Sequence, residues 1–225
     1  MNSKYFLGMV LICFAFISVG VAQNKSSKSV TKKSEIQTIK IGKQIWTKKN
    51  LDIVTYKNGD KIRLCRNTDE WKDAISRKEG ACCYYNYEQK NGELFGLIYN
   101  WFAISDPRGI APQGWHLPND SEWKELIDFL GGKEVAGGKL KEKGTKYWEE
   151  PNMDATNQSG FSALAGGYCL SSGFFSAKGS ECRFWSSSIV DDNIVVYWYM
   201  DSNYNGIIWG NSDKNFGFYV RCVKD

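Results

Sequence analysis

Apolar residues near the start of the folded region alternate with polar ones. Ile39, Ile41 and Ile45 are separated by polar or small residues. Alternation of this kind lets an extended chain bury one of its two faces. The pattern therefore predicts a β-hairpin over 37–46, with its turn at Gly42.

The spacing of apolar residues then becomes helical in two segments. Thr68 can cap a short helix that follows it. Further along, Leu97, Trp101 and Ile104 fall at i, i+4 and i+7, which is the spacing of one helix face. We therefore expect a second, largely buried helix over 94–104.

The clearest helix signal follows Pro118. Asn119 stands three residues before Glu122, as in a capping box, although Asp120 could also serve as the cap. A pair of glycines begins at Gly131 and is expected to end the helix. The apolar positions between cap and stop keep helical spacing and are Trp123, Leu126, Ile127 and Leu130.

The last third of the chain changes to short apolar runs separated by turn residues. In its final run, Phe216, Phe218, Val220 and Cys222 would share one face of a strand. The sequence thus predicts an α+β domain over 35–225, with helices early and an antiparallel sheet late. The other predicted strands are centred on 161–164, 184–188, 194–200 and 207–209.

Residues 1–22 have the pattern of a secretory signal peptide. Lys4 gives a positive start, 5–19 is apolar, and small residues precede Gln23. The apolar run is about fifteen residues, shorter than the ~20 that a spanning helix needs. Two alternatives are an uncleaved anchor and a lipoprotein site at Cys13. Later segments are not apolar enough to span a membrane, so we expect a secreted or cell-surface protein.

Charge is distributed unevenly between the leader and the remainder. The chain has 29 basic and 25 acidic residues, and five of the lysines precede residue 35. Subtracting these five leaves 24 basic against 25 acidic residues over 35–225, a net charge of −1. The segment 23–34 is basic and polar, so we predict a disordered spacer there. A nucleic-acid-binding domain usually keeps a basic surplus, so this class is set aside.

Six of the seven cysteines lie outside the leader, an even number that suggests disulfides in an exported chain. Six cysteines allow 15 pairings, and sequence alone does not choose among them. A structural zinc site is disfavoured because no C-x-x-C spacing occurs and His116 is the single histidine. The six are Cys65, Cys82, Cys83, Cys169, Cys182 and Cys222.

The segment 112–123 combines rigid turn residues with two tryptophans. Prolines fix backbone angles, and Gly114 permits one that other residues resist. We interpret the segment as structural framework, in which His116 makes a hydrogen bond that holds the turn. Its framework residues are Gly114, Trp115, His116, Pro118 and Trp123.

Taken together, these motifs resemble the Fibrobacter succinogenes major paralogous domain, a family of exported bacterial proteins. The resemblance covers roughly 37–225. Its motifs, in order, are Ile39-Lys40-Ile41-Gly42-Lys43-Gln44-Ile45-Trp46, Asn50-Leu51, Asn58-Gly59-Asp60, Tyr99-Asn100-Trp101, Pro112 to Trp123, Gly137-Gly138-Lys139-Leu140-Lys141, Asn157-Gln158-Ser159-Gly160-Phe161, Gly166-Gly167-Tyr168, Trp185-Ser186-Ser187 and Val220-Arg221-Cys222-Val223.

The resemblance implies a C-type-lectin-like or sulfatase-modifying-factor-like fold, with two or three helices packed on a twisted antiparallel sheet and long loops. It also implies association with the cell surface, adhesion or glycan capture. The family usually has a cysteine where this chain has Ala111. Cys222 therefore lacks its expected partner, and Cys83–Cys222 is one replacement pair.

A second candidate disulfide is Cys169–Cys182. These two cysteines flank a glycine-containing loop that a hairpin would close. Closing a loop of about 14 residues would stabilise the fold by roughly 3 kcal/mol on the loop-entropy model.

Several catalytic or metal-binding interpretations were weighed and disfavoured. His116 as a catalytic base competes with its framework role, and the adjacent pairs 149–150 and 191–192 are typical of solvated surface carboxylates. Cys82 and Cys83 are poorly placed for a copper-thiolate oxidase. Glu150-Pro151-Asn152 matches a calcium-dependent sugar-binding loop, but the partner strand there lacks its carboxylate. We therefore predict no catalytic residues and no cofactor, with calcium as the alternative.

Aromatic residues are numerous and gather around one predicted hairpin near the C-terminus. Alternate strand residues face opposite sides, so they cannot all be buried together. Core packing is the simpler explanation, but exposed rings near Asn and Asp would suit sugars or a protein partner. The predicted ligand-binding residues are Tyr197, Tyr199, Tyr204, Trp209, Asn203 and Asn205.

These observations favour an exported, non-enzymatic binding module for a glycan or a surface protein. The alternatives are a secreted enzyme of the modifying-factor type and a structural or assembly component of the envelope. The oligomeric state stays open.

Overall fold

A computed structural model describes the chain at Met1 and over residues 36–225. The predicted signal peptide over 1–22 and spacer over 23–34 lie outside the described residues. The described elements from residue 36 onward belong to one compact unit.

A four-stranded sheet joins the two ends of this unit. Its first two strands form the predicted hairpin, in which Ile39 pairs with Trp46. The C-terminal strand is inserted beside that hairpin, with Val223 between Trp46 and His116. In spatial order the sheet consists of β1 (Thr38–Ile41), β2 (Gln44–Thr47), β13 (Val223–Lys224) and β6 (Trp115–His116).

A larger, mostly antiparallel sheet of nine strands forms the centre. Two of its pairings are parallel, β3 with β4 and β7 with β9. The path runs β11 (Ile208–Asp213), β10 (Ile194–Asp201), β9 (Glu181–Ile189), β7 (Gly166–Cys169), β12 (Gly217–Phe218), β5 (Ile98–Asn100), β4 (Ala81–Cys83) and β3 (Arg63–Leu64), with β8 (Phe175–Lys178) paired to β7.

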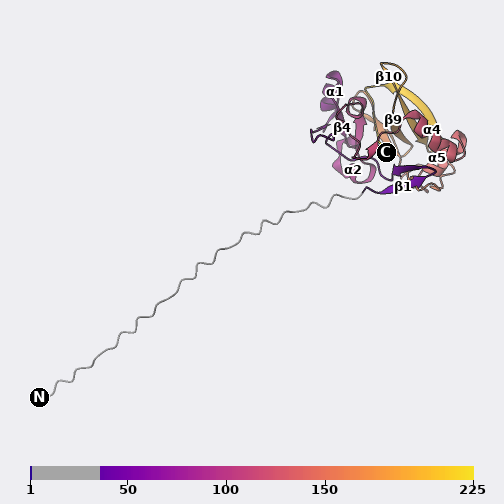
Figure 1. The fold of residues 1–225 in the computed structure, drawn as a ribbon, viewed down its shortest axis with the longest axis horizontal. Helices are drawn as coiled ribbons and strands as arrows, with labels where there is room; N and C mark the ends of the chain where they lie inside the picture. Colours follow the sequence, from indigo (N-terminus) through magenta and orange to yellow (C-terminus); the bar gives the residue numbers. More distant parts are fainter. Residues whose placement is uncertain (2–35) are drawn as a thin grey trace. The chain divides into compact units, whose positions relative to one another are not determined.

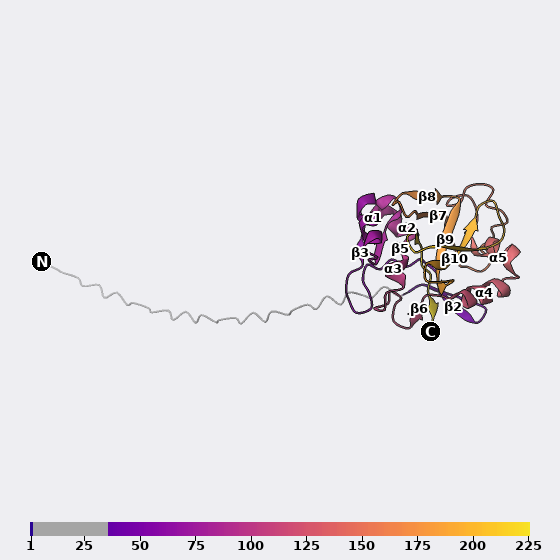
Figure 2. The same cartoon turned by 90° about the horizontal axis from the view of Figure 1, so that it is seen from above.

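The helices lie in two groups at opposite ends of the sheets (Figures 1 and 2). One group holds α1, α2 and α3, and the other holds α4 and α5. The α+β class is therefore confirmed, with five α-helices in the described region where two or three were expected. They are α1 (Thr68–Ser76), α2 (Gln89–Phe95), α3 (Trp101–Ile104), α4 (Asp120–Phe129) and α5 (Lys133–Leu140), and a 3-10 turn, η1 (Tyr85–Tyr87), precedes α2. Among the described residues, none of these helices has the length and apolar content to cross a bilayer.

Local capping explains where the helices begin. Asn119 caps α4 and forms a reciprocal capping box with Glu122, so the prediction for this helix is confirmed and Asp120 is its first residue. For α1 the cap is Asn67, whose side chain accepts from the Glu70 N–H, and the prediction of Thr68 as the cap is wrong by one residue.

The predicted helix over 94–104 is wrong. Its centre is strand β5, which lies between β4 and β12, and it is helical only at its two ends, where α2 finishes and α3 begins. Asn100 explains the change, because its side chain accepts hydrogen bonds from the Ala81 N–H of β4 and the Ala103 N–H of α3. A polar side chain that joins two elements in this way stabilises a boundary that helical spacing alone does not reveal.

The final apolar run also differs from its prediction as one strand. It crosses from the large sheet at β12 to the small sheet at β13. Alternation is nevertheless preserved, since Phe218, Val220 and Cys222 enter one core cluster while Tyr219 enters the other. The segment therefore ties the two sheets together.

Candidate functional site

The structure separates the residues predicted to bind a ligand. Tyr197 and Tyr199 lie on one face of β10, because alternate strand residues share a face. Trp209 pairs with Trp198 across β10 and β11, so it lies on the opposite face, beside α4. The turn between β10 and β11 holds the other three.

Those three residues face α5 or solvent rather than a shared pocket. The Tyr204 hydroxyl donates to the Glu134 carboxylate of α5. The Asn205 carbonyl accepts from the Gly138 N–H at 2.6 Å, and Asn203 is exposed. The six predicted residues thus lie on separate surfaces, and what they bind stays a prediction.

Tyr197 and Tyr199 belong to a cluster that we call the aromatic face, defined as Tyr168, Arg183, Tyr197, Tyr199 and Phe216. The Arg183 guanidinium lies 3.6 Å from the Tyr168 ring centroid and 5.3 and 5.4 Å from those of Tyr197 and Tyr199. Burial raises the pKa of both Tyr197 and Tyr199, so their hydroxyls stay protonated at neutral pH.

The charge of Arg183 is satisfied within the aromatic face. Both its Nε and its Nη2 lie 2.8 Å from Glu181 Oε2, and only 15% of its side chain is exposed. Cation–π contacts and an ion pair therefore already satisfy this cation.

The segment 112–123 places its two tryptophans in the core and its histidine between two carboxylates. Gly114 has φ of 79°, and Trp115 and Trp123 are buried. His116 lies between two carboxylates, with Nε2 2.7 Å from Glu122 Oε1 and Nδ1 2.7 Å from Asp225 Oδ1. Burial alone would lower the pKa of His116, but hydrogen bonds to Asp225 and Glu122 outweigh it and raise the pKa. Both ring nitrogens are therefore engaged in holding the turn.

All six cysteines of the described region are free, buried thiols, and neither predicted disulfide is formed. Cys83 and Cys222 lie in different core clusters. The Cys169 thiol donates to the Leu170 carbonyl at 3.5 Å, and the neighbour that raises the pKa of Cys83 beyond the effect of burial is Cys169 rather than Cys222. The strand pairing that brings Cys83 toward Cys169 joins distant parts of the chain, so loop length could not indicate it.

Cys82 and Cys83 point to opposite faces of β4, and each belongs to a different core cluster. Burial raises the pKa of both thiols well above its ordinary value. A thiolate pair for metal chemistry is therefore not assembled at these two residues.

The segment 150–152, which resembles a calcium-binding loop in sequence, does not present a set of oxygen ligands. The Asn152 side chain is buried and donates to the Glu142 and Gly144 carbonyls at 3.0 and 2.8 Å. Across the part of the chain that the structure describes, no three His, Cys, Asp or Glu side chains converge as a metal site would require.

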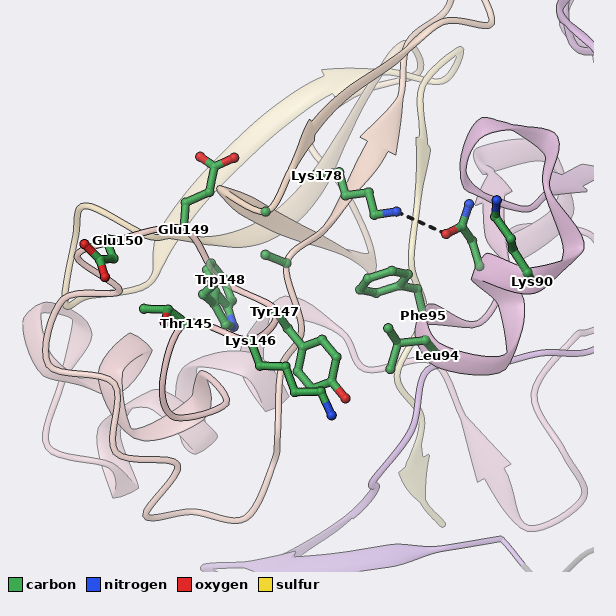
Figure 3. Close-up of a pocket in the computed structure, with 13 residues that line it drawn as sticks. Lys90, Leu94, Phe95, Thr145, Lys146, Tyr147, Trp148, Glu149, Glu150 and Lys178 are labelled. Atoms are coloured by element: carbon green, nitrogen blue, oxygen red, sulfur yellow. Dashed lines mark hydrogen bonds between the residues drawn. The ribbon is translucent and has the colours of Figure 1, made fainter.

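A cleft of about 760 Å³ opens between α2 and the loop 145–150 (Figure 3). Tyr147 lies across the cleft from Leu94 and Phe95. Trp148 is buried behind them and donates from Nε1 to the Ala163 carbonyl at 2.9 Å. The cleft thus has apolar and aromatic walls on a rigid support.

Polar groups converge on the same cleft. Lys178 at the end of β8 reaches across to α2 and donates from Nζ to Asn91 Oδ1 at 3.1 Å (Figure 3). Asn91 is buried and oriented by its own donation to the Tyr85 carbonyl at 2.8 Å. Lys146 lies beside Tyr147, with Nζ 4.9 Å from the ring centroid.

The lysines of the cleft differ from Arg183 in their partners. Within the described residues, Lys178 and Lys146 form no ion pair, and Lys90 pairs only with the half-buried Glu88 at 3.0 Å. Lys178 Nζ also lies 5.3 and 5.4 Å from the Tyr85 and Phe95 ring centroids. Rings and an amide thus partly compensate Lys178, but it has no carboxylate partner within the described residues, so an incoming anionic group can pair with it.

None of the cleft residues was predicted to bind a ligand, because they come from three distant segments. One signal was present in the sequence: 146–150 places two aromatic residues among charged ones in a loop.

Residues 39–224 match the model of the Fibrobacter succinogenes major domain, so the chain belongs to this family, as its motifs predicted. No curated protein and no solved structure matches the chain.

Proposed function

We propose that this chain is an exported, non-enzymatic binding module with a lectin-like architecture, and that a glycan binds in the cleft between α2 and the loop 145–150. The apolar leader over 5–19 supports export. The cleft replaces the C-terminal aromatic residues as the favoured site.

The observation that carries the proposal is the pairing of aromatic walls with donors that lack ionic partners. The C–H face of a sugar ring can stack on Tyr147, as apolar groups do on aromatic rings. Lys178 and Lys146 can then donate to sugar oxygens. Ligand sites typically combine apolar walls with a few well-oriented polar groups, and Asn91 keeps the Lys178 ammonium in place.

Binding is favoured over catalysis by the positions of the reactive groups. Both nitrogens of His116 are engaged, and the thiols of the described region are buried. Glu149 and Glu150 at the cleft are exposed, whereas a glycosidase acid needs surroundings that keep its proton at neutral pH. A protein ligand on the aromatic face is the second candidate, supported by its half-exposed rings.

The test is a glycan array probed with the full chain and two variants. Tyr147→Ala removes the stacking ring of the cleft and is expected to lower the affinity for bound glycans about tenfold. Tyr199→Ala makes a matched change on the aromatic face and should leave the signals intact.

Three outcomes separate the candidates. Signals lost only with Tyr147→Ala support the cleft. Signals lost only with Tyr199→Ala assign glycan binding to the aromatic face and overturn the cleft. No glycan signal from the intact chain overturns glycan binding and leaves a protein partner as the candidate.

A further inference from the structure

A second, smaller depression adjoins the cleft. We call it the hollow; its volume is about 230 Å³, and its lining includes Gln37 just before β1, the segment 48–50 just after β2, and Arg221. Leu94 and Tyr147 line both depressions. The cleft and the hollow therefore form two compartments of one groove, divided by this pair of side chains.

Arg221 is a buried cation that lines the hollow, with 2% of its surface exposed. Its Nε donates to Asn50 Oδ1 at 2.5 Å, and Nη1 donates to the Thr47 and Phe161 carbonyls at 2.8 and 3.1 Å. Its Nη2 reaches the Ser162 carbonyl only at 3.4 Å. Every one of these acceptors is neutral, and the guanidinium carbon also lies 4.4 Å from the Phe161 ring centroid.

No carboxylate in the described region forms an ion pair with Arg221. A buried guanidinium normally has an anion beside it, because desolvation of a lone charge is costly. The Nη2 group is the most weakly bonded part of the guanidinium. The hollow beside it can receive an anionic group from a ligand.

Positive charge is concentrated along the whole groove. Six cationic side chains line it against four carboxylates, a net charge of +2 in a region whose overall net charge is −1. One of the four, Glu142, accepts from Asn157 Nδ2 at 2.8 Å. The cations are Lys48, Lys49, Lys90, Lys146, Lys178 and Arg221.

We propose that the groove binds an acidic polysaccharide, a chain of sugar units that carry carboxylates. One carboxylate lies near Lys178 in the cleft, and another lies near Arg221 in the hollow, with a sugar ring against Tyr147 between them. This inference rests on the proposed glycan-binding function and adds the chemical class of the ligand. An acidic peptide carries similar charge but offers no flat C–H face for the Tyr147 ring.

The test measures binding of the full chain to oligogalacturonate by calorimetry. The neutral comparison is the same oligosaccharide with its carboxylates methyl-esterified. We expect the acid to bind at least about tenfold more tightly than the ester at low salt. The preference should shrink strongly at about 1 M salt, since screening acts on the exposed lysines.

Two substitutions locate the charges without touching the buried arginine. Lys178→Gln in the cleft and Lys49→Gln at the hollow should each lower the affinity for the acid about threefold to tenfold, and the loss should be larger for the acid than for the ester. Lys72→Gln removes an equally exposed lysine on α1 and should change neither affinity. Polyglutamate of matched charge should bind more weakly than oligogalacturonate.

The outcomes distinguish this inference from the function on which it rests. Equal binding of acid and ester overturns the inference and leaves glycan binding intact. A preference that survives both groove substitutions also overturns it, since the basic segment 23–34 would then explain the attraction. If polyglutamate binds as tightly as oligogalacturonate, the ligand class is an acidic peptide and the acidic-polysaccharide proposal is overturned. No binding to acid, ester or any arrayed glycan overturns both proposals.

Discussion

The aromatic face and the cleft both combine aromatic rings with cationic side chains, but the cations have different partners in the two regions. In the aromatic face, Arg183 is mostly buried, paired with Glu181 and stacked on Tyr168. In the cleft, Lys178 has an amide partner and no ion pair within the described residues, beside the partly exposed Tyr147. One cluster is complete in itself, whereas the other leaves charge available.

This difference shows why the abundance of aromatic residues is a weak guide to a binding site. Rings and cations also stabilise a fold when they pair with each other. A ligand site is better indicated by polar groups that converge on a concave surface without ionic partners. The comparison makes predictions about stability as well as about binding.

The largest effect is expected from Arg183→Ala. The free energy of unfolding of this variant should fall by about 3 kcal/mol. The Glu181 carboxylate, only 20% exposed, would lose its ion-pair partner, and the Tyr168 ring would lose its cation–π contact. Lys178→Ala should lower the free energy of unfolding by about 1 kcal/mol, because it removes one hydrogen bond to Asn91 and no ion pair. Urea unfolding measures both. Similar losses in the two variants would remove the distinction between the regions.

Trp148 tests whether the back of the cleft is structural. Trp148→Phe should lower the free energy of unfolding by about 2 kcal/mol, because the buried ring becomes smaller and the Ala163 carbonyl keeps only the Glu142 N–H as its donor. Tyr147→Phe, the neighbouring change at the open wall, should be nearly neutral in the same urea titration. A neutral Trp148→Phe would mean that the wall can rearrange, and the cleft would then be less preorganised than proposed.

Gly210 tests how tightly the aromatic face is packed. A Cβ there would overlap the Tyr197 ring, so Gly210→Ala should cost about 1 kcal/mol as that ring shifts. In a Tyr197→Ala background the same change should cost almost nothing. Additive losses in this double-mutant cycle would argue that the ring is free to move and the face is open.

The smallest effect lies outside both regions and concerns pH. The raised pKa of His116 means that its stabilising contribution is complete below the unfolded value of about 6.5 and is lost as pH rises through the folded value. The contribution should stay below about 1 kcal/mol, since 39% of the side chain is exposed. Urea midpoints at about pH 6 and about pH 8 should differ in the intact chain and converge in His116→Gln. An unchanged difference in the variant would place the titrating group elsewhere.

Features that depend on neighbours in the sequence could be predicted from it. The hairpin at Gly42 and the helix capped by Asn119 each form through contacts within a few residues, so their patterns indicate them directly. The family, too, follows from motifs in sequence order. The strand β5 could not be predicted, because its pairing with β4 and β12 overrides the helical spacing of its residues.

The candidate site depended on the tertiary structure altogether. Lys178, Asn91 and Tyr147 come from separate elements and meet only when β8 lies beside α2 and the loop before Pro151. The sequence shows how many charges and rings the chain has, but their pairing depends on distance and burial. The ion pair of Arg183 with Glu181 is local, since the two residues are two positions apart on one face of β9. Packing decided the rest, because it placed the Tyr168 ring against Arg183 and left Lys178 with an amide partner and no ion pair among the described residues.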